Sequence, residues 1–259
     1  MSDAAEIGDR SGAPEAAPPE GRVLDERLAE LDRTRAEFLA TASHELRTPI
    51  TSILGYAALL SEDTELPSMH RQIIGRIERN GRRLLGLVED MLTMSRIEEG
   101  TFRFVKSPLD LREPVAAAVD AIRPALDIHQ LLLDQDISEE PVRVFGDGEK
   151  LERVATNLLS NAAKFSHPGD RIRLRLSSVG DQAVLSVADS GVGIRAEDQP
   201  HLFDRFFRGT DATTRAIQGV GLGLPIAGSI VEGHDGRIEV DSKVGRGSTF
   251  VVRLPRLAG

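Results

Sequence analysis

The stretch Ala40–Tyr56, "ATASHELRTPITSILGY", decides the fold of the N-terminal part, because its apolar residues recur at helical spacing. Each helical residue turns the side chain by about 100°, so this spacing places the apolar residues on one face. The stripe contains Phe38, Ala42, Leu46, Ile50, Ile53, Ala57 and Leu60, and the same period running backwards adds Leu24, Leu28 and Leu31. We therefore predict one long helix over residues 23–60 with a single apolar face.

His44 lies about half a turn away from this stripe, on the face that solvent can reach. Thr48 shares its face, and Glu45 sits on the flank between that face and the stripe. Pro49 has no N–H, so the carbonyl of Glu45 loses its helical partner and a bend is expected beside His44. A histidine is more often packed or merely solvated, but this position and these neighbours make His44 a candidate reactive residue.

Composition restricts the possible classes of protein. With 259 residues and 40% hydrophobic content, the chain has room for one large or two ordinary domains with real cores. The absence of cysteine excludes disulfides, thiolate metal sites and cysteine nucleophiles, and a formal charge of -9 argues against a nucleic-acid partner. No apolar run approaches the ~18 residues of a membrane span, and no signal-peptide pattern is present. We expect a cytoplasmic chain without a membrane segment, either whole or as the cytoplasmic part of a longer sensor.

The sequence divides into three parts. Residues 1–21 are rich in Ala, Pro, Glu and Gly, which predicts a disordered tail. In residues 22–100 a second helix is expected to run to about Glu98, with Gly100 as its stop signal. Its apolar face consists of Ile73, Ile74, Ile77, Leu84, Val88, Met91 and Leu92. Two one-sided helices form an antiparallel hairpin that buries its stripe only partly, so we predict a dimeric four-helix bundle.

Residues 101–259 show mixed α and β patterns. We predict a short strand at "TFRFV", a helix at "LREPVAAAVDAIRPAL", and a strand at "PVRVFGD" leading into a helix that Asp147 could cap. The segments "RIRLRLSS" and "QAVLSVAD" alternate around a turn, and "GRIEVDSKVGRGSTFVVRLP" is a second hairpin. These elements predict an α/β sandwich, with a hinge near Ser107 and Pro108 connecting it to the helical hairpin.

One helix of this sandwich carries a polar face. Asn157, Asn161 and Lys164 are spaced i, i+4 and i+7, so two amides and an ammonium lie on one side. Two amide oxygens beside a cation suit Mg²⁺ and phosphate. For these three residues alone, an ordinary solvated helix face is equally consistent.

Two glycine-containing stretches supply a context for that face. In "DSGVGI", Asp189 ends an apolar strand, where its carboxylate could accept from an exocyclic amine such as that of adenine, and Gly191 and Gly193 let the backbone approach a flat ligand. In "QGVGLGLPIAGSI", Gly219, Gly221 and Gly223 precede a helix whose first N–H groups could meet phosphate oxygens. The G-x-G-x-G spacing without a preceding strand does not fit a dinucleotide-binding fingerprint.

These stretches together resemble the sensor histidine kinases. "SHELRTPI" is similar to the H box of that family, and residues 157–164, 189–193, 201–207 and 219–223 resemble its N, G1, F and G2 boxes in the same order. The resemblance covers about residues 23–256. It implies a dimerisation and phosphoacceptor hairpin at 22–100, followed at 101–259 by a Bergerat-type ATP-binding domain as in gyrase-type ATPases. One departure is "HDG" at 234–236, where the family often has a second glycine in place of Asp235.

The resemblance also implies roles for individual residues. His44 would take the γ-phosphoryl group of ATP with help from Glu45, and Thr48 completes an "HExxT" pattern linked to dephosphorylation of the partner. Asn157 and Asn161 would hold Mg²⁺. The implied nucleotide contacts are Asn157, Asn161, Lys164, Asp189, Gly191, Gly193, Phe203, Arg205, Arg208, Gly219, Gly221, Leu222, Gly223 and Thr249.

The implied partners are a second copy of the chain and the receiver domain of a response regulator, whose aspartate would accept the phosphoryl group. Two alternatives remain at this stage. One is a dimeric adaptor that binds nucleotide without phosphotransfer, and the other is an enzyme that mainly dephosphorylates its regulator.

Overall fold

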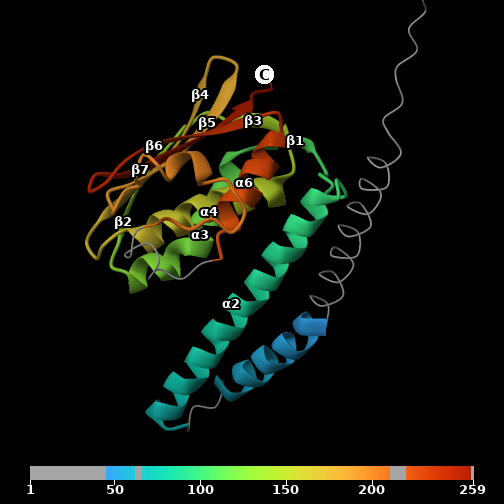
Figure 1. The fold of residues 1–259 in the computed structure, drawn as a ribbon, viewed down its shortest axis with the longest axis vertical. Helices are drawn as coiled ribbons and strands as arrows, with labels where there is room; N and C mark the ends of the chain where they lie inside the picture. The colour runs from blue at the N-terminus through green and yellow to red at the C-terminus, as the bar shows by residue number, and fades with distance from the viewer. Residues whose placement is uncertain (1–44, 62–65, 211–219, 258–259) are drawn as a thin grey trace, which may run out of the picture.

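The computed structural model describes residues 45–61, 66–210 and 220–257. The predicted disordered tail, the first half of the predicted N-terminal helix and His44 lie outside the described residues. The described chain forms a helical hairpin followed by an α/β sandwich, and the long helix α2 of the hairpin runs up to the sandwich (Figure 1). This arrangement confirms the predicted fold class.

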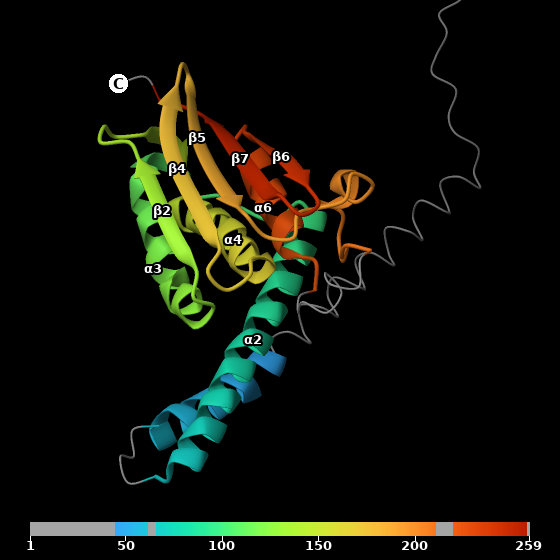
Figure 2. The same cartoon turned by 90° about the vertical axis from the view of Figure 1, so that its left-hand side faces the viewer.

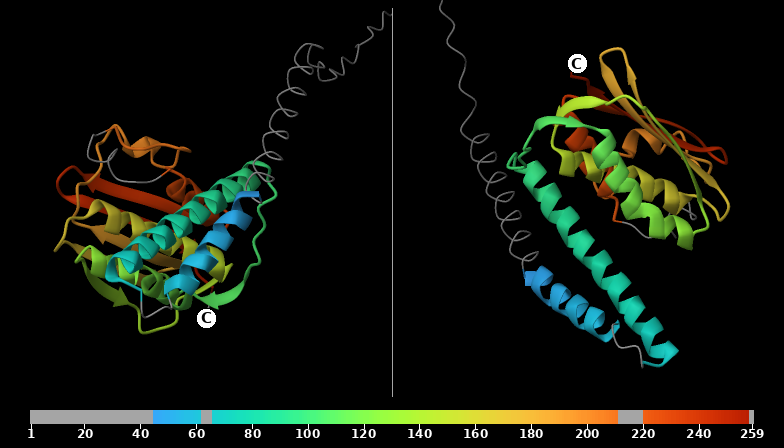
Figure 3. Two further views of the ribbon diagram at one scale, coloured as in Figure 1. Left: turned by 90° about the horizontal axis from the view of Figure 1, so that it is seen from below. Right: turned by 180° about the vertical axis from the view of Figure 1, so that it is seen from behind.

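The helical hairpin consists of residues 45–61 and helix α2 (Ser68–Glu98), which lie side by side in Figures 1 and 3. Ser61 Oγ donates to Glu78 at 3.0 Å, and the side chain of Leu54 lies so close to Gly81 that an added Cβ would approach it within 2.8 Å. The two helices are therefore antiparallel. Helix α2 ends where predicted, and Gly100 has φ +65°, which suits a glycine after a helix end.

The predicted apolar stripe is divided between two surfaces. Ile50 and Ala57 are each 4% exposed inside the hairpin, whereas Leu46, Ile53 and Leu60 remain about half exposed at 48%, 51% and 51%. The facing side of α2 also leaves Ile73, Ile77 and Leu84 exposed. One chain thus covers only part of its own hairpin stripe.

A five-stranded sheet forms one layer of the sandwich, in the order β2-β4-β5-β7-β6. The hairpin of β4 (Arg171–Val179) with β5 (Gln182–Asp189) and the hairpin of β6 (Arg237–Lys243) with β7 (Gly247–Pro255) are antiparallel, as predicted. Strand β2 (Leu132–Ile137) pairs in parallel with β4. The sequence did not indicate β2, because an edge strand with no fully buried residue lacks the usual apolar alternation.

Helices α3 (Arg112–Ile128), α4 (Gly148–Phe165) and α6 (Gly223–Glu232) cover one face of this sheet (Figure 2). A two-stranded sheet of β1 (Ser107–Asp110) and β3 (Arg143–Gly146) and the short 3₁₀ helix η1 (Gln199–His201) complete the described elements. The largest fully buried side chains between helices and sheet include Leu158, Leu159, Ile172, Leu174, Leu176, Ile226 and Ile230. Asp147 caps α4 as predicted, since its carboxylate accepts from the N–H of Lys150 at 3.2 Å.

Two predictions about the connection between the parts are wrong. "TFRFV" alternates like a strand, but residues 101–106 pair with no strand, because Phe102 and Phe104 instead pack against the core of the sandwich. Ser107 and Pro108 are not a hinge, since they belong to β1 and pair with Gly146 and Phe145. The connecting segment is therefore residues 101–106. Within the described residues, every helix is too short or too polar to span a bilayer.

Candidate functional site

The polar face of α4 presents two amide oxygens. Asn157 Nδ2 donates to the carbonyl of Gly223 at 3.0 Å. Because a carbonyl can only accept, this bond fixes the orientation of the amide and leaves Asn157 Oδ1 available. The side chain of Asn161, one turn later, has no hydrogen-bond partner in the described part of the chain. Neutral oxygens of this kind suit Mg²⁺, which keeps several waters and needs few protein ligands when phosphate oxygens also coordinate it.

Lys164 lies on the same helix where α4 meets α2. Although much of its side chain is exposed, surrounding protein atoms desolvate the ammonium and lower the pKa of Lys164; Asp90 of α2 opposes this shift and Arg83 adds to it. Arg153, eleven residues earlier on α4, donates to the same Asp90 at 2.6 Å and to Thr93 Oγ1 at 2.9 Å, so this stretch of α2 is tied to α4. The cationic end of the polar face is therefore at the contact between hairpin and sandwich.

Asp189 provides a carboxylate with one oxygen unused. Its Oδ1 accepts from the N–H groups of Gly191 at 3.0 Å and Ser248 at 3.3 Å, whereas its Oδ2 has no partner among the described residues. Burial raises the pKa of Asp189, the two N–H bonds lower it and Asp170 raises it further. A half-buried carboxylate oxygen without a donor is suited to an N–H group of a ligand.

The glycines after Asp189 are required by the protein's own backbone. A Cβ on Gly191 would lie 2.0 Å from the carbonyl oxygen of Phe165, and one on Gly193, which has φ +70°, would lie 2.1 Å from that of Lys243. Val192 N also donates to the Phe165 carbonyl at 3.1 Å. Close packing of this turn between α4 and the β6–β7 hairpin therefore explains both glycines without a ligand.

The start of α6 leaves backbone donors open. Gly221 has φ +77°, and its carbonyl accepts from Phe206 N at 3.1 Å. Helix α6 begins at Gly223, the side chain of its N-cap residue Leu222 is buried in the core, and among the described residues no side chain accepts from its first N–H groups. The first N–H groups of α6 are thus available to an anion. Gly219 lies outside the described residues.

Residues 201–210 are anchored at both ends of the segment. Phe203 packs against α6 at Gly228, and Thr210 bonds to the carboxylate of Asp198 through both its N–H and its hydroxyl. Arg205 forms an ion pair with Glu98 of α2. Arg208 is exposed and makes an interaction of its own.

Thr249 and Ser248 point to opposite faces of β7. Thr249 is opposite Ala188 and belongs to the half-buried outer row, whereas Ser248 is buried on the side of Asp189, to which its N–H donates. Ser248 Oγ also lies 2.9 Å from Ser242 Oγ. The sequence reasoning named Thr249 and missed Ser248; the alternation along β7, counted from the apolar Phe250, would have placed Ser248 on the inner face.

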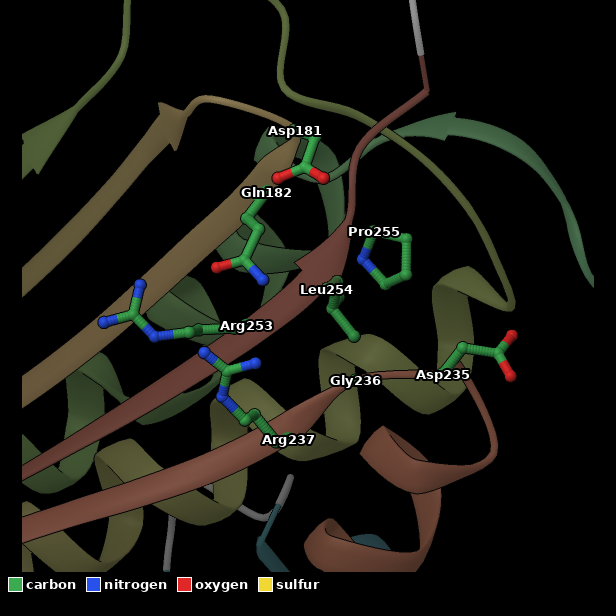
Figure 4. Close-up of a pocket in the computed structure, with 8 residues that line it drawn as sticks. All are labelled: Asp181, Gln182, Asp235, Gly236, Arg237, Arg253, Leu254 and Pro255. Carbon is green, nitrogen blue, oxygen red and sulfur yellow. The ribbon is translucent and has the colours of Figure 1, made fainter.

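A separate cavity of about 200 Å³ lies at the far end of the sheet (Figure 4). It is lined by Asp181, Gln182, Asp235, Gly236, Arg237, Arg253, Leu254 and Pro255. Strand β5 begins at Gln182 and ends at Asp189, so the cavity is about 20 Å away from the Asp189 carboxylate. It is not part of the site around Asp189.

Glu45 and Thr48 are exposed on the helix of residues 45–61, and His44, the residue before this helix segment, lies outside the described residues. The structure therefore brings together Asn157, Gly223 and the start of α6, and separately Asp189, Gly191 and Ser248. It does not place the candidate nucleophile.

Two family models match the chain. Residues 34–100 match the His Kinase A (phospho-acceptor) domain, and residues 146–258 match the histidine kinase-, DNA gyrase B-, and HSP90-like ATPase. The autoinducer 2 sensor kinase/phosphatase LuxQ of Vibrio cholerae is 38% identical over 245 residues, which cover 92% of this chain and 28% of LuxQ. The chain spans half or less of the length of the first curated relatives it matches.

Solved structures of histidine kinases also match the chain. The mycobacterial sensor histidine kinase MprB is 30% identical with a TM-score of 0.53, and the match covers 60% of this chain and all of that structure. Full-length ShkA, in a complex with AMPPNP, is 27% identical with a TM-score of 0.68, and the match covers 86% of this chain and 46% of ShkA.

Proposed function

Because the chain belongs to the sensor histidine kinase family, we propose that it phosphorylates its own His44 with ATP and Mg²⁺ and passes the phosphoryl group to an aspartate of a response regulator receiver domain. We assign residues 22–100 to dimerisation and phosphoacceptance and residues 101–259 to ATP binding, in the cytoplasm, where ATP is available. The observation that carries the proposal is the half-buried carboxylate of Asp189, whose Oδ2 lacks a donor in the described chain.

In this proposal each end of the site recognises one end of ATP. Asp189 Oδ2 accepts from the adenine amine, and the Ser248 N–H holds the carboxylate in place. The amide oxygens of Asn157 and Asn161 face Mg²⁺, and Lys164 with the first N–H groups of α6 binds phosphate oxygens. Mg²⁺ supplies neutralisation of the phosphate charge. Phe203, Arg205, Arg208, Gly219 and Thr249 are assigned to the border of the site by the family resemblance alone.

The transfer is a displacement at phosphorus. A ring nitrogen of neutral His44 forms the N–P bond with its lone pair, the bond from the γ-phosphorus to the bridging oxygen breaks, and ADP leaves with that electron pair. Glu45 accepts the hydrogen bond of the other ring nitrogen and so stabilises the positive charge that develops on the ring. Little else is required of the protein than alignment and charge stabilisation, so the main task is to bring the two domains together.

The exposed side of the hairpin supports a homodimer. One chain leaves an apolar surface that runs along both helices and consists of Leu46, Ile53, Tyr56, Leu60, Ile73, Ile77 and Leu84. A second copy would cover it by forming a four-helix bundle.

The test is incubation with radiolabelled ATP. The parent should acquire acid-labile, base-stable label, and His44→Gln should acquire none while nucleotide affinity stays within about twofold, because acceptor and nucleotide site lie in different domains. A nucleotide-binding adaptor would show affinity without label in the parent. Label retained by His44→Gln would contradict the assignment of the nucleophile.

A second activity, dephosphorylation of the regulator, is favoured by Thr48. Its side chain is exposed on the helix, one turn after His44, where its hydroxyl can hold a water in line with the aspartyl phosphate of a docked regulator. LuxQ is named a sensor kinase/phosphatase.

A further inference from the structure

The segment of residues 101–106 continues directly from the end of α2. The N–H groups of Thr101 and Phe102 both donate to the carbonyl of Arg96, at 3.0 and 2.9 Å, and so cap the last turn of α2. The side chains then alternate, with Phe102 and Phe104 half-buried and Val105 83% exposed. This segment therefore touches the sandwich through its aromatic rings, which pack edge to face at 5.0 Å.

Asp147 holds this segment to the sandwich by its carboxylate. Its Oδ2 accepts from the N–H of Val105 at 2.9 Å, while its Oδ1 accepts from the N–H of Lys150 and caps α4. Its own N–H donates to Nε2 of His234 at 2.9 Å. Asp147 is only 7% exposed, and these three hydrogen bonds connect residues 101–106, the start of α4 and the end of α6.

His234 completes this junction from the end of α6. It is 3% exposed, its Nδ1 lies 2.7 Å from the carbonyl of Ile230, and its ring packs edge to face on Phe104 at 5.0 Å. Because a carbonyl only accepts, Nδ1 carries the proton, and Nε2 is free to accept from Asp147 N. Two hydrogen bonds and one ring contact thus hold the imidazole in place.

The junction lies at the opposite end of a helix pair from the nucleotide site. The start of α6 is bonded to the middle of α4 by Asn157 and Gly223, and the chain just after the end of α6 is bonded to the start of α4 by Asp147 and His234. Ten residues separate Asp147 from Asn157, and ten-residue α6 spans the same distance, about 15 Å, in the opposite direction. A displacement of the junction would therefore displace both helices that carry the phosphate-binding groups.

We propose that Asp147 and His234 are positioning residues for autophosphorylation. They fix residues 102–106 to helices α4 and α6, so that the nucleotide site keeps a defined orientation relative to the end of α2. The proposal rests on the proposed function, since it concerns delivery of the phosphoryl group to His44. Both residues lie outside the proposed nucleotide site. Without the bond to Asp147, the segment keeps only the ring contacts of Phe102 and Phe104 and the ion pair of Lys106 with the exposed Asp235, so the bound nucleotide samples more unproductive orientations.

Val105→Pro tests the junction from the linker. Proline has no N–H, so the bond to Asp147 is lost, while the cap of α4 and the sandwich core are unchanged, because the Val105 side chain is exposed. The matched control is Arg103→Pro, two residues earlier on the same exposed side, whose N–H makes no bond in the described chain. With saturating ATP, we expect Val105→Pro to lower the single-turnover autophosphorylation rate by at least about tenfold and Arg103→Pro by less than about twofold. Affinity for a fluorescent ATP analogue should be unchanged in both.

Asp147→Ser tests the same bond from the other side. Serine remains a good N-cap for α4, but its single oxygen cannot also reach Val105 N. Its control is Asp110→Ser. Asp110 also has a carboxylate that accepts two backbone N–H groups, those of Arg112 and Val142, but among the described residues it makes no hydrogen bond to residues 101–106. Asp147→Ser should reproduce the loss of rate with parental nucleotide affinity, and Asp110→Ser should not.

A distance measurement separates positioning from general damage. The chain has no cysteine, so Glu89→Cys in α2 and Ser177→Cys in β4, both at exposed positions, can be spin-labelled specifically. The distance distribution between the labels should broaden in Val105→Pro and Asp147→Ser, and stay narrow in Arg103→Pro. Parental rates in both junction variants, or equal losses in junction variants and controls, would overturn the proposal. If the parent itself acquires no label, the proposed function fails instead.

Discussion

Replacing Asp189 by asparagine should have opposite effects on the stability of the nucleotide-free protein and on nucleotide affinity. The asparagine side chain would keep an Oδ1 for the N–H groups of Gly191 and Ser248, which lie 3.0 and 3.3 Å from Oδ1 in the parent. It replaces the unpartnered Oδ2 by an amide group that can only donate. The backbone support of the site is therefore preserved, and the acceptor for the adenine amine is removed.

The effect on stability follows from the direction of the pKa shift. Burial, opposed by the two N–H bonds and aided by Asp170, raises the pKa of Asp189 above its usual 3.8. The carboxyl group of Asp189 thus binds a proton more readily in the folded state than in the unfolded chain. The free energy of unfolding therefore falls as the pH rises through the folded pKa and the carboxylate ionises. At pH 7.5 the substitution removes this cost. The melting temperature without nucleotide should stay the same or rise.

The effect on affinity follows from the lost hydrogen bond. A hydrogen bond to a charged group contributes about 1.5–3 kcal/mol, which corresponds to about 10- to 150-fold in Kd. With ligand at about 100 times the parental Kd, nucleotide should stabilise the parent by about 2.7 kcal/mol and a variant with 30-fold weaker binding by about 0.9 kcal/mol. Titration calorimetry and thermal unfolding with a non-hydrolysable ATP analogue measure both quantities.

Asp110→Asn is the matched control. Asp110 Oδ1 also accepts from two backbone N–H groups, at 3.1 Å each, but its Oδ2 is ion-paired with Arg112 and it lies in β1, away from the site. This variant should lose stability and keep nucleotide affinity. Parental affinity in Asp189→Asn, or a loss of nucleotide-free stability as large as that of Asp110→Asn, would refute the reasoning.

Three further predictions concern other parts of the chain. Thr48→Ala should keep autophosphorylation but slow dephosphorylation of the regulator by at least about tenfold, or ~1.4 kcal/mol of barrier; equal phosphate release by parent and variant would show that Thr48 is only part of the helix. Asn161→Asp should reduce autophosphorylation by at least about tenfold, because a carboxylate beside the phosphates disturbs Mg²⁺ coordination, while size-exclusion chromatography still finds the dimer. Burial, opposed chiefly by the bond to Ile230, lowers the pKa of His234 below 6.5. The neutral imidazole therefore contributes its full stabilisation above about pH 6.5, and this contribution declines as the pH falls from there towards the pKa of the folded state. Urea unfolding at pH 7.5 and 5.5 should therefore show a larger acid loss for the parent than for His234→Phe, and equal losses would exclude this histidine as the cause.

The sequence alone determined the features that depend on local periodicity. The stripe from Leu46 to Leu60, the end of α2 before Gly100 and the cap at Asp147 all follow from spacing within a few residues. The two β-hairpins follow equally from alternation around short turns. Such signals are short-range, because 3.6-residue and two-residue periods fix which side chains share a face whatever the rest of the chain does.

The tertiary structure decided what each face contacts. A stripe does not reveal that Ile50 is buried within one chain while Ile53 stays exposed, because that depends on where α2 lies. The extended segment at Phe104 looked like a strand, since alternation cannot tell a pairing strand from a chain that packs by its rings. The contact of Asp147 with His234 joins residues 87 positions apart. It required the helices α4 and α6 to be laid antiparallel, and that arrangement comes from burying their apolar faces on a common sheet, which no local pattern encodes.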